Sequence, residues 1–114
     1  MFAGMPRMPR VVVLGTGGTI SGAAAVDHAY RAAVAPVADL VAALPGLDRV
    51  ADVETIQVSQ IDSVDMDDAG VLAVARAADA VLRRSDVDGV VITHGTDTME
   101  ETAFVLHLTV RSPK

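Results

Sequence analysis

The run Val11-Val12-Val13-Leu14 is apolar at every position, and a glycine-rich segment, residues 15–22, follows it directly. A short continuous apolar run is typical of a strand that is buried on both faces, as in a parallel sheet. Valine, isoleucine and threonine at several positions predict a second strand over residues 50–58. Residues 89–93 are again a continuous apolar run and predict a third strand.

Helices are predicted between and after these strands. Residues 36–44 begin with a proline, which is a typical first residue of a helix. Over residues 67–84 the apolar positions fall on one helical face: Val71, Val74, Ala75, Ala78, Val81 and Leu82. Residues 98–101 match a capping box, so a third helix should run from there to about Val110. The alternation of strand and helix predicts a three-layer α/β/α domain with a parallel sheet, of class α/β.

Composition excludes several functional classes. The chain carries a net charge of −6 and only 3% aromatic residues, which disfavours nucleic-acid binding by charge and by base stacking. It has no cysteine, so disulfides and thiolate chemistry are excluded. We find neither a membrane-length apolar run nor a signal peptide after residues 1–9, which resemble a loose leader. We therefore expect a cytoplasmic protein without membrane contact.

Three polar loops follow the carboxyl ends of the predicted strands: residues 15–22, 59–68 and 93–97. In open α/β sheets the ligand crevice lies at this edge, so the three loops should converge on one site. The first loop fails the dinucleotide fingerprint at Ile20 and the phosphate-loop pattern at Ala23. It is either a tight turn with capping hydroxyls or a backbone that approaches a ligand.

The third loop gathers an imidazole, a carboxylate and hydroxyl groups within six residues. If Thr98 caps the following helix together with Glu101, Thr96 and Asp97 are left outside the helix, facing the crevice. His94, next to the strand end, is more typical of a structural hydrogen-bond partner. A triad of serine, His94 and Asp97 is disfavoured, because the last two lie on one short loop.

The middle loop is acidic, with Asp62, Asp65, Asp67 and Asp68 around Ser63. These carboxylates lack the spacing of a calcium-binding loop. We expect Asp65 to cap the second helix, with the next two aspartates in its first turn, where they favour the positive end of the helix dipole. The sequence therefore predicts no metal site.

Two motifs together resemble the signatures of the bacterial-type L-asparaginase family. They are Thr16-Gly17-Gly18-Thr19-Ile20-Ser21 and Ile92-Thr93-His94-Gly95-Thr96-Asp97-Thr98-Met99-Glu100-Glu101-Thr102. The resemblance covers residues 11–110. It implies that residues 10–114 are the start of the larger N-terminal asparaginase domain, that this domain is incomplete, and that the C-terminal domain is absent.

The resemblance implies catalytic roles for four residues. Thr19 corresponds to the nucleophile that attacks the side-chain amide carbon. Tyr30, matched in approximate position, corresponds to the mobile-loop tyrosine that helps to activate this threonine. Thr96 corresponds to the second active-site threonine, which helps to position water and the carbonyl oxygen. Asp97 corresponds to the carboxylate that pairs with the substrate's α-ammonium group.

The resemblance also implies substrate-binding positions. Ser63 corresponds to the residue that holds the α-carboxylate, and Thr96 and Asp97 contribute to binding as well. Gly18 and Gly95 lie in the glycine-rich loops whose preorganised N–H groups would hold the oxyanion. No metal and no cofactor are implied.

The chain departs from the family pattern in two respects. Val64 follows the binding serine, where the family usually has a polar residue, often glutamine or serine. The family's catalytic lysine lies beyond position 114, and the only lysine here is Lys114. We therefore expect the 114-residue chain alone to be inactive. We also expect apolar surface to be exposed beside the third strand, which would make the chain prone to aggregate.

The resemblance thus implies an amidohydrolase that converts L-asparagine to aspartate and ammonia, with L-glutamine as a candidate second substrate. The full-length form is implied to be a homo-oligomer, a dimer or a tetramer. Two alternatives stay open. One is a non-catalytic amino-acid-binding remnant, and the other is an asparaginase-like module of an amidotransferase.

Overall fold

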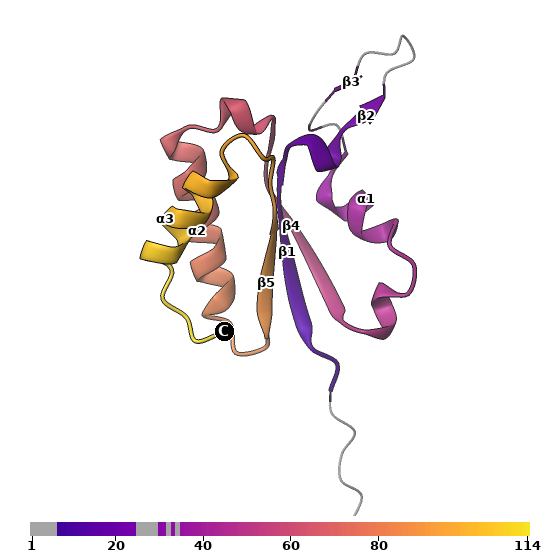
Figure 1. The fold of residues 1–114 in the computed structure, drawn as a ribbon. Coiled ribbons are helices and arrows are strands. Elements are labelled where there is room, and N and C mark those ends of the chain that lie inside the picture. Colours follow the sequence, from indigo (N-terminus) through magenta and orange to yellow (C-terminus); the bar gives the residue numbers. More distant parts are fainter. Residues whose placement is uncertain (1–6, 25–29, 32, 34) are drawn as a thin grey trace, which may run out of the picture.

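The computed structural model describes residues 7–24, 30–31, 33 and 35–114 (Figure 1). The strands are β1 (Arg10–Gly17), β2 (Ala23–Ala24), β3 (Tyr30–Arg31), β4 (Asp52–Ile61) and β5 (Gly89–Thr93). The α-helices are α1 (Val37–Ala42), α2 (Asp68–Leu82) and α3 (Met99–Thr109). Three short 3-10 turns complete the chain: η1 (Thr19–Ser21), η2 (Leu47–Arg49) and η3 (Ser63–Asp65).

The main sheet has the strand order β4-β1-β5, and both pairs of neighbours are parallel. Strand β4 lies on one side of β1, and the chain then crosses β1 to reach β5 on the other side of β1. Helix α1 lies on one face of the sheet, and α2 and α3 lie on the opposite face (Figure 1). The predicted three-layer α/β/α domain with a parallel sheet is confirmed. The direction of the connections reverses at β1, and in open α/β sheets the ligand site lies at the carboxyl ends of the strands at such a point, here β1 and β5.

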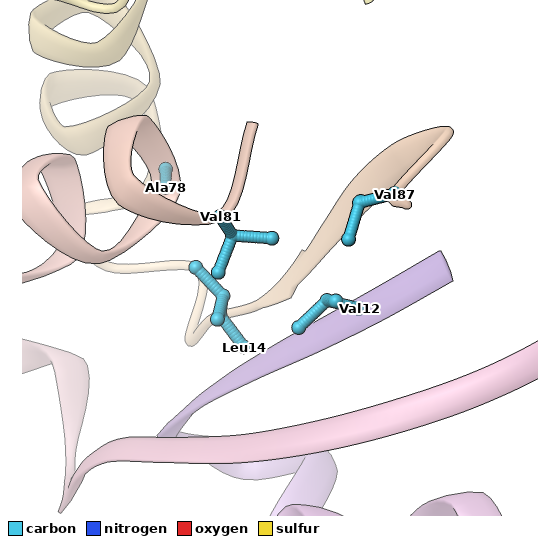
Figure 2. Close-up of a cluster of buried hydrophobic side chains, with 5 residues drawn as sticks. All are labelled: Val12, Leu14, Ala78, Val81 and Val87. Carbon is cyan, nitrogen blue, oxygen red and sulfur yellow. The ribbon is translucent and has the colours of Figure 1, made fainter. Parts of the chain in front are cut away.

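The core lies between the sheet and α2. Val12 and Leu14 of β1 pack with Ala78 and Val81 of α2 and with Val87, which precedes β5 (Figure 2). All five side chains are at most 5% exposed. Full burial of a valine or leucine side chain contributes about 1.5–3 kcal/mol, so this cluster holds the central strand to the helix layer.

Two strands are longer than predicted. Strand β1 continues to Gly17, which pairs with Ile61 of β4. Gly15 lets α1 approach closely, because a Cβ there would lie 2.5 Å from the Cβ of Val37. Strand β4 continues to Ile61 with a shift of register opposite residues 15–17. Between β1 and α1, the two-residue strands β2 and β3 pair antiparallel.

Two predicted helix caps are wrong. Asp67, not Asp65, caps α2, and its carboxylate accepts a hydrogen bond of 2.8 Å from the backbone N–H of Gly70. Asp65 lies instead in η3, after which the backbone is extended at Met66, so the helix begins later. Thr98 precedes α3 as predicted, but its side chain makes no capping hydrogen bond.

Helix α1 covers strand β5 less than it covers the other two strands of the sheet. This helix contacts β1 and β4, and Val91 of β5 stays 50% exposed. An open apolar cavity of about 420 Å³ lies between α1 and this face of the sheet, lined by residues of β1, β4 and β5. On the other side, Phe104 and Leu108 of α3 are also exposed. The apolar surface predicted beside the third strand is therefore present.

Charged side chains tie the elements together at the amino edge of the sheet. Arg84 and Arg10 both hydrogen-bond Glu54, with the closest atoms 2.9 and 3.1 Å apart. These hydrogen bonds lower the pKa of Glu54 to about 2, and the hydrogen bond from Arg84 has the larger effect. Arg7 pairs with Asp88 at 2.8 Å, and residues 1–6 of the predicted leader lie outside the described residues. None of the described helices is long and apolar enough to span a membrane.

Candidate active site

The three polar loops lie together at the carboxyl edge of the sheet. The N–H of Gly18, after β1, donates to the carbonyl of Ile61, at the end of β4, over 2.8 Å. A Cβ at Gly18 would lie 2.5 Å from the Cα of Gly95, the second residue after β5, so the first and third loops touch through backbone atoms. Gly18 also has φ +79°, a conformation that favours glycine.

Ser63 and Asp97 form the best-defined polar pair of this edge. Ser63 is buried, and its hydroxyl donates to the Asp97 carboxylate over 3.1 Å. In return, the backbone N–H of Asp97 donates to the Ser63 hydroxyl oxygen over 3.2 Å. The two hydrogen bonds fix the carboxylate against the hydroxyl, while Asp97 itself is exposed. The pair can therefore present one negative charge and one hydroxyl group to a ligand.

Thr98 fixes the main chain of the same pair. Its hydroxyl donates to the carbonyl oxygen of Ser63 over 2.8 Å, because η3 lies against the start of α3. The sequence pattern assigned this hydroxyl to a helix cap, so its role in linking the second and third loops was missed. The local sequence gives no signal for it, since the partner is 35 residues away.

Other hydroxyl groups of the first two loops serve the scaffold. Thr16 is buried and donates to the carbonyl of Thr93 over 2.8 Å, which ties β1 to the end of β5. The Ser59 hydroxyl donates to the carbonyl of Thr16 over 3.1 Å, which ties β4 to β1. The Ser21 hydroxyl donates to the carbonyl of Gly18 over 2.9 Å. These three hydroxyls are thus engaged in holding the loops.

His94 is a buried link within the third loop. Its Nδ1 lies 2.7 Å from the carbonyl oxygen of Gly95, and its Nε2 lies 3.0 Å from the hydroxyl of Thr102 on α3. A carbonyl oxygen only accepts, so Nδ1 carries a proton. With a neutral ring, Nε2 then accepts the Thr102 hydroxyl proton. This agrees with the prediction of a structural partner for His94, whereas Thr102 was not singled out.

The remaining predicted residues are placed as follows. Thr96 is exposed in the loop after β5, beside the Ser63 and Asp97 pair in sequence and space. The backbone of Thr19 lies in η1, directly after Gly18, and the backbone of Tyr30 lies in β3. The side chains of Thr19 and Tyr30 lie outside the described part of the structure.

Two further features bear on the chemistry of this edge. Val64 follows Ser63 and exposes 68% of its surface, so an apolar side chain borders the polar pair. Across the described ranges of the chain, no cluster of three or more histidine, aspartate or glutamate side chains is placed to hold a metal ion. The groups present are an exposed carboxylate, hydroxyls and backbone N–H groups, which suit a polar ligand carrying both charges.

Comparison with known proteins gives consistent matches. The family described as "Asparaginase, N-terminal" matches residues 10–114. Over 107 residues the chain is 45% identical to a glutaminase-asparaginase of Acinetobacter glutaminasificans, covering 91% of this chain and 32% of that protein. It is 43% identical to L-asparaginase 2 of Escherichia coli, covering 94% of this chain and 31% of that protein. A probable periplasmic L-asparaginase of Haemophilus influenzae is also 43% identical, and the match covers 99% of this chain and 32% of that protein.

A solved structure agrees with these matches. The crystal structure of a probable cytoplasmic L-asparaginase from Campylobacter jejuni superposes with a TM-score of 0.77 at 40% sequence identity. The match covers 86% of this chain and 31% of that protein. The chain thus spans about a third of the length of the curated relatives and of this structure. By its sequence and its α/β fold, the chain belongs to the asparaginase family, and residues 10–114 match the N-terminal part of that family.

Proposed function

We propose that this chain supplies the strand-exit loops of an amidohydrolase that acts on L-asparagine. The observation that carries the proposal is the Ser63 and Asp97 pair, fixed by two hydrogen bonds at the crevice. A free α-amino acid carries an ammonium group and a carboxylate on the same carbon atom. The Asp97 carboxylate suits the ammonium group, and the Ser63 hydroxyl suits the carboxylate when it exchanges its hydrogen bond to Asp97 for one to the ligand.

The proposed reaction begins with Thr19. Its hydroxyl oxygen attacks the side-chain amide carbon, the carbon–nitrogen bond breaks, and the hydroxyl proton passes to the leaving nitrogen, so ammonia departs. A water molecule positioned by Thr96 then cleaves the acyl-threonine and releases aspartate. Tyr30 helps to activate the threonine, as the family resemblance implies. The loop N–H groups around Gly18 and Gly95 suit the negative charge that develops on the carbonyl oxygen.

The wider protein is proposed from the relatives. The names of three similar proteins combine glutaminase and asparaginase, which supports L-glutamine as a second substrate. The family resemblance supports a homo-oligomer, without metal or cofactor, in which a lysine outside this chain completes the site. The cytoplasm is the proposed compartment, supported by the similarity to the Campylobacter jejuni protein, and cell fractionation tests it.

Ammonia release from L-asparagine by the full-length product of the gene tests the proposal. We expect turnover by the wild type and a loss of about a thousandfold or more in kcat for Thr19→Ala, because the nucleophile is removed. Thr19→Ser, which keeps a hydroxyl, should retain part of the activity. Thr109→Val removes an exposed hydroxyl at the end of α3 and should leave kcat unchanged. Full activity in Thr19→Ala would exclude this nucleophile.

A second function is favoured by the same pair of residues. Ser63 and Asp97 bind both charges of an amino acid without any contribution from Thr19, so the chain could act as an amino-acid-binding module. Calorimetry with L-aspartate separates the two functions. Binding together with ammonia release supports the amidohydrolase, and binding without release supports the module.

A further inference from the structure

A buried chain of hydrogen bonds runs from α3 into the third loop. Thr102 is 2% exposed and His94 is 8% exposed. The Thr102 hydroxyl lies 3.0 Å from Nε2 of His94, and Nδ1 of the same ring lies 2.7 Å from the carbonyl oxygen of Gly95. The direction of the chain is fixed at its end, because the carbonyl oxygen accepts only. The Gly95 carbonyl therefore fixes the proton on Nδ1, and the Thr102 hydroxyl donates to the unprotonated Nε2, which holds the ring from its other side.

The end of this chain sets the orientation of one peptide group. The structure has no cis peptide bond among its described residues, so the carbonyl of Gly95 and the N–H of Thr96 point in opposite directions. The carbonyl points to the buried His94 ring, and the Thr96 N–H therefore points away from that ring. Within the described part of the chain no acceptor is found for this N–H. The next N–H, of Asp97, donates to Ser63.

We propose that Thr102, acting through His94, positions the Gly95–Thr96 peptide so that the Thr96 N–H stabilises the oxyanion of the amide substrate. Both side chains are positioning residues, because they are buried and reach the reacting atoms only through this peptide. The inference rests on the proposed amidohydrolase function. It explains why the hydrogen bonds of two buried polar side chains end on the backbone of the site loop rather than within the core.

Kinetics of the full-length product test the role of Thr102. Thr102→Val keeps the shape of the side chain and removes the hydroxyl, so we expect kcat to fall by about tenfold to a hundredfold. KM should stay within about twofold, because Ser63 and Asp97 still bind the substrate. Thr102→Ser should restore kcat. Thr109→Val makes the same change on the same helix, where the hydroxyl bonds only its own helix over 2.7 Å, and should change neither constant.

Solid-state ¹⁵N NMR tests the hydrogen bonds without requiring activity. In histidine-labelled protein we expect a proton on Nδ1 of His94 and none on Nε2. In threonine-labelled protein, Thr102→Val should shift the Thr96 amide signal and Thr109→Val should not. His94→Asn keeps a donor near the Nδ1 position and should retain more kcat than His94→Leu.

The outcomes separate this inference from the proposed function. A proton on Nε2 of His94, an unmoved Thr96 amide in Thr102→Val, or an unchanged kcat in that variant would overturn the inference. A fall of kcat in Thr102→Val that Thr102→Ser does not restore would also overturn it, because packing would then be the cause. If the wild type releases no ammonia from L-asparagine, the proposed function fails. The NMR signals of the His94 ring and of the Thr96 amide then still show whether the Gly95–Thr96 peptide is held by the hydrogen bonds described.

Discussion

Adding one methyl group at Gly95 tests whether the three loops meet as closely as the structure shows. In Gly95→Ala the new Cβ would overlap the hydroxyl oxygen of Ser63 and lie 2.6 Å from its Cβ. It would also lie 3.2 Å from the Cα of Gly18. Ser63 is 2% exposed and cannot turn into solvent, so the loops must separate. The two hydrogen bonds between Ser63 and Asp97 should then weaken or break.

The size of the effect follows from these contacts. Overpacking costs about 1–3 kcal/mol, and each lost hydrogen bond costs about 0.5–1.5 kcal/mol. Replacing glycine stabilises the folded state by about 0.4–1 kcal/mol through the unfolded chain, which offsets part of the loss. We expect Gly95→Ala to lower the free energy of unfolding by about 2–3 kcal/mol. At a urea m-value of about 1–3 kcal/mol per molar, the midpoint should move down by about 1 M or more.

Gly89→Ala is the matched control. A Cβ at Gly89, at the start of β5, meets no atom within 4 Å, so this variant should be as stable as the wild type or slightly more stable. The assay is urea unfolding of the three chains at low protein concentration, followed by circular dichroism. Equal midpoints for Gly95→Ala and Gly89→Ala would refute the close approach of the loops.

Four further predictions concern binding, acid stability and association. In the full-length product, Asp97→Asn should raise KM for L-asparagine by about tenfold to a hundredfold, because the partner of the ammonium group loses its charge; an unchanged KM would exclude the pairing. Val64→Gln should lower KM, since a hydrogen-bonding side chain replaces an exposed apolar one, whereas Val64→Leu should not. The folded-state pKa of Glu54 is lowered from 4.5 to about 2, chiefly by its hydrogen bond with Arg84, so its contribution to stability is present above pH 4.5 and is lost as the pH falls towards 2. Glu54→Gln should therefore lose less stability than the wild type in acid titrations between these values, and an identical loss would contradict the pairing. The 114-residue chain alone should release no ammonia above background, and it should self-associate in sedimentation experiments. Val91→Lys should reduce this association, because it charges the exposed face of β5. A monodisperse wild-type chain would contradict the predicted association.

Local patterns were sufficient for the elements that bury apolar side chains. The third strand was predicted with the bounds of β5, and the apolar face of residues 67–84 identified α2. The fold class followed from the alternation of these elements. The Asp65 cap failed for a local reason, because Asp65 lies in the turn η3 and the helix begins after it. The Thr98 side chain does not cap because of a longer-range contact. Thr98 has the spacing of a capping residue, but a carbonyl group 35 residues away takes its hydroxyl.

The candidate site could be predicted only in part for the same reason. The position of the three loops followed from the strand order expected for a parallel sheet. The hydrogen bonds between Ser63 and Asp97, and between Thr102 and His94, join residues that no local pattern connects, so they required the structure. The continuous apolar run of β5 predicted burial on both faces. Val91 is nevertheless half exposed, because α1 is short and contacts mainly the other two strands.

The central position of β1 has a consequence during synthesis of the chain. The side chain of Arg10, the first residue of β1, bonds Asp52 of β4, which follows 42 residues later. The backbone N–H of Arg10 bonds Asp88, which follows 78 residues later and directly precedes β5. At about 5–20 residues per second, the ribosome needs roughly 4–16 s to supply the second partner. During this time one edge of β1, the most buried of the three strands of the main sheet, has no partner. The nascent chain should therefore depend on chaperones in this interval, and substitutions that slow its translation should lower the yield of folded protein.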